Sequence, residues 1–302
     1  MRIRVTVAAV SGALALSALA APSALAADSG SSHKLDLLKT AQAAIGHTAS
    51  GKSSFSGAAA DEAPVLDATF SNFKIAKAIK VGTTNHVTAA ASYTITHGAD
   101  VDVTSDDFIT IPALYRGSFD EPDNVLVPQN EPGVCKVVSA TVANCSAKID
   151  IYPLDGDLIS SDAGTWHAAG IAANFDENDP ENSPEVVQGS LGTTLVQRVS
   201  RLTVNASPEP VKKGATITVT GALTRANWDD NKYHGYTGQS VQLQFRKKSS
   251  STYTTVKTIK TDSKGNLKTT VKASADGYFR YNFAGTTTTP AIVAAGDFVD
   301  VK

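Results

Sequence analysis

Four carboxylates and three side-chain amides crowd into the stretch from Asn174 to Asn182. Ca²⁺ prefers roughly six to eight hard oxygen ligands, which carboxylates and amides can supply together from one loop. The spacing lacks the EF-hand pattern, in which alternating acidic residues precede a glycine and a distal glutamate. The stretch therefore predicts either a calcium site or a solvated loop between two strands. The carboxylates of that site would be Asp176, Glu177, Asp179 and Glu181.

Two further acidic clusters could hold a metal or act as a general acid and base. One surrounds Gly156, which together with its neighbours also predicts a tight turn. Because surface carboxylates are numerous in this region, such pairs arise by chance, and a carboxylate-dependent hydrolase is the least favoured function. The clusters are Asp150, Asp155, Asp157 and Asp162, and Asp100, Asp102, Asp106 and Asp107.

A predicted loop over residues 227–236 contains a tryptophan, two tyrosines and two carboxylates. Aromatic rings beside polar groups can stack on sugars or grip a protein partner. Alternatively, Trp228 and Tyr233 cap the open end of a sandwich. The candidate binding residues are Trp228, Asp229, Asp230, Tyr233 and Tyr236.

The two cysteines, Cys135 and Cys145, are ten residues apart. In an exported protein such a pair is typically bonded, and the short loop it closes would stabilise the fold by about 3 kcal/mol. No cluster of histidines accompanies them, so the pair predicts a structural disulfide rather than a zinc site.

Familiar catalytic motifs are missing from the sequence. None of the histidines belongs to a His-Glu-x-x-His run, and no strand leads into Gly-x-Ser-x-Gly or a phosphate-binding glycine loop. The sequence therefore predicts a protein that is not an enzyme.

The N-terminus has the form of an export signal. Arg2 and Arg4 precede an apolar stretch, Val5–Ala21, and Ala24 and Ala26 frame a small-residue cleavage box. The stretch contains Thr, Ser and Gly and is short for a membrane span. We expect a signal peptide over residues 1–26, cleaved before Ala27, and a secreted protein without a membrane span, which disfavours nucleic acid as a partner.

Residues 27–64 predict a helix followed by a linker. Apolar residues recur at helical spacing over His33–Ile45, and the Ser-, Gly- and Ala-rich stretch that follows has the composition of a flexible connection. The pattern leaves open whether this helix docks on the next domain or stays free.

Short segments of alternating polarity, separated by turn residues, then continue to the C-terminus and predict two β-sandwiches, over residues 65–204 and 205–302. Trp166 lies inside an apolar segment and is expected in the core. In the segment Tyr253–Lys260 the apolar residues do not all fall on one face of a strand, and a bulge near Thr254 and Thr255 would bring them onto the same face. The expected strands of the first sandwich are Ala68–Ile75, Asn85–Thr96, Phe108–Tyr115, Val134–Val142, Ala147–Tyr152, Thr165–Ala173 and Thr193–Val204; those of the second are Arg201–Ala206, Ala215–Leu223, Ser240–Arg246, Tyr253–Lys260, Asn266–Ala273, Tyr278–Ala284 and Phe298–Val301.

Charge is distributed unevenly between the two predicted sandwiches. Residues 65–204 carry 18 Asp and Glu against 8 Lys and Arg, a net charge of −10. Residues 205–302 carry 14 Lys and Arg against 7 Asp and Glu, a net charge of +7. A basic sheet face could bind anionic envelope polymers such as teichoic acids, or it could dock against the acidic half. The basic residues are Arg246, Lys247, Lys248, Lys257, Lys260, Lys264, Lys268 and Lys272.

Several segments carry a resemblance. They read SRLTVNASP (200–208), VQLQFR (241–246), TVKT (255–258), DGYFR (276–280) and FAGT (283–286), with a weaker match through AGTW (163–166) and the cysteine pair. They resemble secreted actinobacterial, streptomycete-type proteins with a C-terminal bacterial Ig-like domain, mostly uncharacterised and some labelled calcium-binding. The resemblance implies the fold and is almost silent on activity.

Together these features predict an all-β protein with two tandem immunoglobulin-like β-sandwich domains. The expected function is an extracellular, non-enzymatic binding or structural module that recognises a cell-envelope component or a protein partner. A secreted Ca²⁺-binding protein that uses the acidic loops of the first domain is the alternative.

Overall fold

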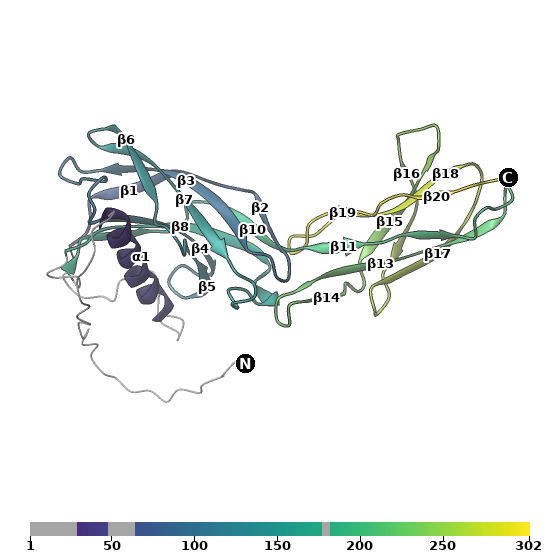
Figure 1. The fold of residues 1–302 in the computed structure, drawn as a ribbon, viewed down its shortest axis with the longest axis horizontal. Helices are drawn as coiled ribbons and strands as arrows, with labels where there is room; N and C mark the ends of the chain where they lie inside the picture. The colour runs from purple at the N-terminus through teal and green to yellow at the C-terminus, as the bar shows by residue number, and fades with distance from the viewer. Residues whose placement is uncertain (1–28, 48–63, 177–181) are drawn as a thin grey trace, which may run out of the picture.

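The chain folds into two β-sandwiches arranged end to end, with a long helix against the first (Figure 1). The computed structural model describes residues 29–47, 64–176 and 182–302. The predicted signal peptide and most of the linker lie outside these residues. The predicted all-β, immunoglobulin-like architecture is confirmed.

Two antiparallel-rich sheets face each other in the first sandwich. One has the order β1-β3-β7-β6, and the other β2-β10-β8-β4-β5 with β9 paired to β8. The bounds are β1 Ala68–Ile75, β2 Ala78–Val81, β3 Val87–His97, β4 Phe108–Gly117, β5 Pro122–Leu126, β6 Val134–Ser139, β7 Val142–Ile151, β8 Gly164–Asn174, β9 Glu185–Gln188 and β10 Thr193–Arg198, with a short 3-10 turn at Ser160–Asp162.

The alternation in β3 sets which side chains enter this core. Ala89, Ala91, Tyr93 and Ile95 are buried, whereas the residues between them face outward. Such period-two burial is what a strand with one solvated face produces. Trp166 on β8 is fully buried, as its sequence context predicts.

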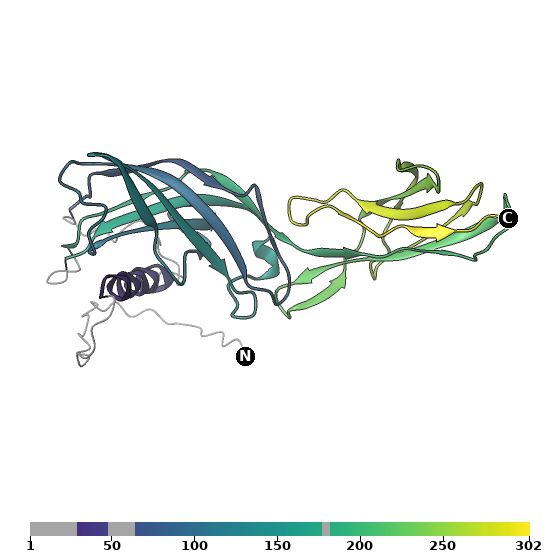
Figure 2. The same cartoon turned by 45° about the horizontal axis from the view of Figure 1, so that its top comes forward.

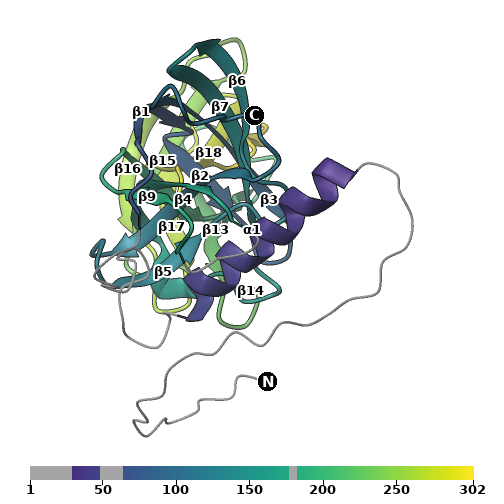
Figure 3. The same cartoon turned by 90° about the vertical axis from the view of Figure 1, so that its left-hand side faces the viewer.

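Helix α1 (Ser29–His47) lies across the second sheet of this sandwich (Figures 2 and 3). Leu38 is fully buried against Ile109 and Ile111 of β4 and Ile171 of β8. The Gln42 amide donates a hydrogen bond to the Pro128 carbonyl at 2.5 Å. The predicted helix is confirmed, and it is docked: β4 is buried on both faces because α1 covers the outer one.

The second sandwich is built around the long strand β13. One sheet has the order β11-β13-β12, with β14 and β17 also paired to β13, and the other has the order β16-β15-β18-β19, with β20 paired to β18. The bounds are β11 Ser200–Leu202, β12 Asn205–Ser207, β13 Thr216–Asn227, β14 Lys232–Gly235, β15 Ser240–Lys247, β16 Thr254–Lys260, β17 Asn266–Lys272, β18 Gly277–Phe283, β19 Ile292–Val293 and β20 Asp297–Val299.

The core of this sandwich follows the predicted parity. Val241 and Leu243 on β15 are buried with Phe279 and Tyr281 on β18. The pairing of β15 with β16 shifts register between Leu243 and Gln244, which leaves Val256 without a cross-strand partner. A bulge is therefore present one residue after the predicted position.

Several predicted strand boundaries are wrong. The segment Val134–Val142 is two strands, because the chain turns at Ala140 and Thr141, which carry no glycine or proline signal. The segment Thr193–Val204 divides into β10 and β11. The short strands β2, β5, β9, β14 and β19 were not predicted, because two to five residues are too few for a period-two pattern to stand out.

The disulfide between Cys135 and Cys145 is confirmed. The two residues sit directly opposite each other on β6 and β7, with a Cα–Cα distance of 4.0 Å. The bond joins the edge strand β6 to its neighbour, so its role in this fold is that of a structural cross-link.

Candidate functional site

The predicted aromatic loop lies at the joint between the sandwiches. Trp228 is 1% exposed and packs with Ile79 and Val81 in the core of the first sandwich. Its indole N–H donates to the Gly82 carbonyl at 2.9 Å, and its backbone N–H donates to Ser160 Oγ at 3.1 Å. The indole of the second sandwich therefore closes one end of the first, and offers no surface to a partner.

Arginines reinforce this joint. The Arg198 Nε–H donates to the Ala226 carbonyl at 2.5 Å, and burial lowers the pKa of Arg198 to about 10. The Arg201 guanidinium lies 3.6 Å from the Tyr233 ring centroid, and that of Arg225 lies 3.9 Å from Tyr236. These contacts fix the loop by hydrogen bonds and cation–π attraction, which is stronger where the cation is partly desolvated.

The two carboxylates of the same loop remain on the surface. Asp229 and Asp230 are exposed, and the Asp230 carboxylate accepts a 2.7 Å hydrogen bond from His234, which lowers the pKa of Asp230. Within the predicted binding set, the two acids are exposed and Tyr233 and Tyr236 are half-buried. A binding role for these four residues stays a prediction.

Of the four carboxylates predicted to bind calcium, only Asp176 lies in the described part of the chain. Asp176 is exposed, and its backbone N–H donates to Ser183 Oγ at 3.0 Å. Glu177, Asp179 and Glu181 fall outside the described residues. Among the residues that are described, no group of three or more His, Cys, Asp or Glu is placed to hold a metal ion. Calcium binding by this loop stays a prediction.

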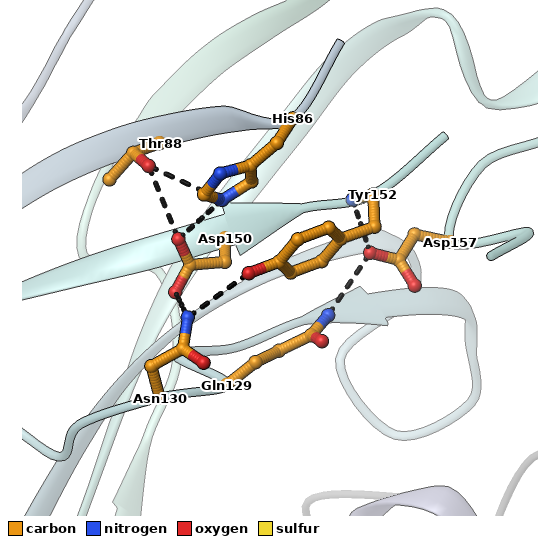
Figure 4. A network of polar contacts seen from close by, with 7 residues as sticks. All are labelled: His86, Thr88, Gln129, Asn130, Asp150, Tyr152 and Asp157. Carbon is orange, nitrogen blue, oxygen red and sulfur yellow. Dashed lines mark hydrogen bonds and ion pairs between the residues drawn. The ribbon is translucent and has the colours of Figure 1, made fainter. Parts of the chain in front are cut away.

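A polar network surrounds Asp150 at the end of β7 (Figure 4). The Asp150 side chain is only 6% exposed, and its carboxylate contacts His86 Nε2 at 2.7 Å. The same carboxylate accepts hydrogen bonds from Thr88 at 3.2 Å and Asn130 at 3.0 Å. The Tyr152 ring stacks on His86, with centroids 4.2 Å apart. A buried carboxylate is tolerated here because several donors surround it.

This network does not form a nucleophile relay. Both the Asp150 carboxylate and the Thr88 hydroxyl approach the same nitrogen of His86, at 2.7 and 3.4 Å. A relay requires the carboxylate on one ring nitrogen and the nucleophile on the other. The contacts instead tie β3, β7 and the loop before β6 together.

A cavity of about 300 Å³ opens beside the network, between β5 and the loop that precedes β8. Asp123, Asp157 and Asp162 line it. Asp162 accepts hydrogen bonds from Asn124 at 3.0 Å and from the Ile159 backbone at 2.8 Å. Burial raises the pKa of Asp157, which accepts hydrogen bonds from Tyr152 and Gln129. Two carboxylates of the predicted cluster around Gly156, those of Asp157 and Asp162, thus line one cavity. Their hydrogen bonds hold the loop that precedes β8 in place.

The third acidic cluster anchors local structure. Asp102 accepts hydrogen bonds from the Thr104 hydroxyl at 2.6 Å and its backbone at 2.9 Å, which lower the pKa of Asp102. Asp107 pairs with His33 of α1 at 3.3 Å. These contacts shape the 98–107 loop and help to seat the helix.

A row of cations and aromatic rings crosses the outer face of the second sandwich, on the sheet that contains β15, β16, β18 and β20. Arg280 lies 3.7 Å from the Tyr253 centroid, and Arg246 lies 5.4 Å from the same ring. Arg246 also lies 3.9 Å from the Tyr278 centroid. We call the six residues of this arrangement the cation–aromatic row: Lys248, Phe298, Tyr278, Arg246, Tyr253 and Arg280.

Two members of the row, Arg246 and Lys248, are among the basic residues predicted from the sequence. The other four were not predicted as site residues. A signal was present, because Tyr278 and Arg280 alternate with the buried Phe279 and Tyr281. What the sequence lacks is the cross-strand register: Arg246 faces Tyr278, and Gln244 faces Arg280.

Comparisons with known proteins find a match only among solved structures. No protein-family model matches the chain, and no curated protein matches it. Similar solved structures include the adhesin InvE of Yersinia pseudotuberculosis (11% identity, 76% of this chain and 58% of that one, TM-score 0.23) and the D00-D0 domain of intimin (16%, 76% and 99%, 0.24). The ectodomain of mouse nectin-like molecule 4 is another (13%, 79% and 65%, 0.22).

The chain spans less than two thirds of the adhesin and nectin-like structures. Within the described residues, no helix is long and apolar enough to cross a membrane.

Proposed function

We propose that this protein is an extracellular, non-enzymatic binding module whose basic second sandwich contacts a polyanionic component of the cell envelope. The observation that carries the proposal is the succession of Lys248, Arg246 and Arg280 on one sheet of that sandwich, within a half of the chain whose net charge is +7. The eight predicted basic residues do not share one face, because β17, with Lys268 and Lys272, belongs to the opposite sheet. The export-signal pattern at the N-terminus and the disulfide between Cys135 and Cys145 support a location outside the cell.

The end-to-end arrangement suits this role electrostatically. The acidic sandwich would be repelled by a polyanion, and the basic one attracted. In Figure 1 the two bodies lie along one axis, with the C-terminus at the far end of the basic body. Trp228 and the joint arginines hold the 227–236 segment of the second sandwich against the first. The two bodies would therefore keep this arrangement, and the protein would meet a charged surface with its C-terminal half.

Sedimentation of the mature protein with purified Gram-positive cell walls tests the proposal. We expect binding at low salt that weakens steadily as salt screens the charges. Parallel series in calcium and in chelator separate this mechanism from one that requires Ca²⁺, since a charge-driven contact survives chelation. Absence of sedimentation at every salt concentration would contradict the proposal and favour a soluble protein partner.

A further inference from the structure

We propose that the cation–aromatic row is the binding site, and that its ligand is a phosphodiester polymer of the poly(glycerol phosphate) type. This inference rests on the proposed function, and it adds the site and the chemical class of the ligand. The row lies on one face of the second sandwich, whereas Lys264, Lys268 and Lys272 lie on or beside β17 of the opposite sheet.

The cations of the row are held in line by the rings between them. Lys248 lies 5.3 Å from the Phe298 centroid, and the Phe298 and Tyr278 centroids are 5.1 Å apart. Arg246 contacts the Tyr278 ring next, and the guanidinium groups of Arg246 and Arg280 both lie near the Tyr253 ring. Three positive charges therefore succeed one another across the face, which matches a ligand with one negative charge in each repeat.

Hydrogen bonds fix both guanidinium groups and leave donors free for a ligand. Arg280 donates through Nε to Gln244 Oε1 at 2.9 Å, and Arg246 donates through Nη1 to the Ser250 carbonyl at 2.9 Å. A guanidinium carries five N–H donors, so each retains several. Because the side chains are already ordered, binding costs less conformational entropy than it would for free lysines.

The positive charge of the row has no carboxylate partner within ion-pair distance among the described residues. Nearby carboxylates are engaged elsewhere: Asp276 accepts from the Val301 N–H at 2.9 Å, and Asp297 accepts from the Ala206 N–H at 2.6 Å. The ion pairs of the described chain join His33 to Asp107, Lys39 to Asp36, His86 to Asp150 and His234 to Asp230.

The geometry favours an anion over a stacking ligand. The Tyr278 ring has Arg246 and Phe298 beside it, and the Tyr253 ring has Arg280 and Arg246 beside it. Sugars and nucleobases need an open ring face. Phosphate oxygens diverge tetrahedrally and can accept from two guanidinium groups that flank one ring, whereas a planar carboxylate is suited to a single fork.

Gly296 gives Tyr253 its place in the row. A Cβ at this position would collide with the Tyr253 hydroxyl and press on Tyr278. The glycine therefore lets the ring lie where both guanidinium groups can reach it, and the row depends on a backbone position outside its own six residues.

Binding of poly(glycerol phosphate) to the mature full-length chain tests the proposal, with poly-L-glutamate, oligothymidylate and dextran as the other probes. The decisive variants are R246Q/R280Q and the matched control K268Q/K272Q, which removes the same charge from the opposite sheet. We expect R246Q/R280Q to weaken binding about tenfold or more and the control about threefold or less. R246K/R280K keeps the charge and loses the fork, so it should also bind more weakly than the unmodified chain.

The outcomes separate this inference from the proposed function. Equal losses in the two charge pairs, with unchanged melting temperatures, would overturn the site. Tighter binding of poly-L-glutamate than of poly(glycerol phosphate) would overturn the phosphodiester class. Tighter binding of oligothymidylate, a phosphodiester that carries bases, would show that a stacking ligand is preferred and would overturn the poly(glycerol phosphate) type. If the protein sediments with cell walls but does not bind poly(glycerol phosphate), the inference is refuted and the proposed function stands. If it binds in neither assay, the inference and the proposed function are both refuted.

Discussion

Aromatic residues do two different jobs in this protein, and burial decides which. Trp228 is buried, and its indole N–H donates a hydrogen bond to the Gly82 carbonyl of the other sandwich. Tyr253 and Tyr278 stay half-buried on a sheet face and carry guanidinium groups. The same chemistry of ring and cation thus stabilises the joint in one place and orients charges toward solvent in the other.

Replacing Trp228 with alanine should loosen the joint. Removal of a fully buried tryptophan typically costs about 3 to 5 kcal/mol. We expect Trp228→Ala to lower the melting temperature of the first sandwich and to divide unfolding into two calorimetric transitions. Trp228→Phe retains a ring and loses only the hydrogen bond to Gly82, so its effect should be smaller. A single unshifted transition in Trp228→Ala would contradict the interdomain role.

Asp157 should make stability depend on pH. Burial raises the pKa of its carboxyl in the folded state, so the favourable contribution is complete below the ordinary carboxyl pKa of about 4 and is lost as pH rises through the raised value. Asp157→Asn should therefore raise the melting temperature at pH 7 and have less effect at pH 3. Equal shifts at the two pH values would show that desolvation of this group is not the cause.

At the scale of elements, Leu38 is the most deeply buried of the described side chains of the docked helix. Leu38 is fully buried on β4 and β8, while its neighbour Lys39 is 62% exposed at the side chain. We expect Leu38→Ala to destabilise helix docking by about 2 to 4 kcal/mol, and Lys39→Ala to change little. Hydrogen exchange of the α1 amides measures both, and equal protection in the two variants would contradict the docking.

The disulfide should stabilise the β6–β7 hairpin. Replacing Cys135 and Cys145 together with alanine is expected to lower the free energy of unfolding by about 3 kcal/mol, because the unfolded chain regains the entropy of a short loop. Denaturant unfolding of oxidised, reduced and substituted protein provides the comparison. If the free energy of unfolding fell in the reduced protein but not in the double variant, the loss would come from the free thiols and not from the missing cross-link.

Local pattern explains what the sequence could predict of these elements. Val241, Leu243 and Phe245 alternate with polar residues, so their burial follows from strand geometry alone. The hairpin turn at Ala140 and Thr141 carries no such signal. The position of Trp228 depends on a contact with Gly82, 146 residues away, and no local pattern encodes a contact of that range.

The whole molecule is electrostatically polar along its length. The first sandwich region carries a net charge of −10 and the second +7, and the joint holds them end to end. Long-range attraction of a polyanion to one end is screened beyond about 10 Å at 0.1 M salt. The strength of binding should therefore depend on ionic strength, and the orientation of the bound protein on the row of the second sandwich.

Nuclear magnetic resonance of the arginine Nε–H groups tests the central claim most directly. Poly(glycerol phosphate) would be titrated into the mature protein while each arginine signal is followed. Arg201 and Arg225 are internal references, because they also lie on tyrosine rings but at the joint. We predict that the Arg246 and Arg280 signals shift together and saturate while the references stay still. Shifts at the joint arginines, or uniform small shifts at every arginine, would contradict the account.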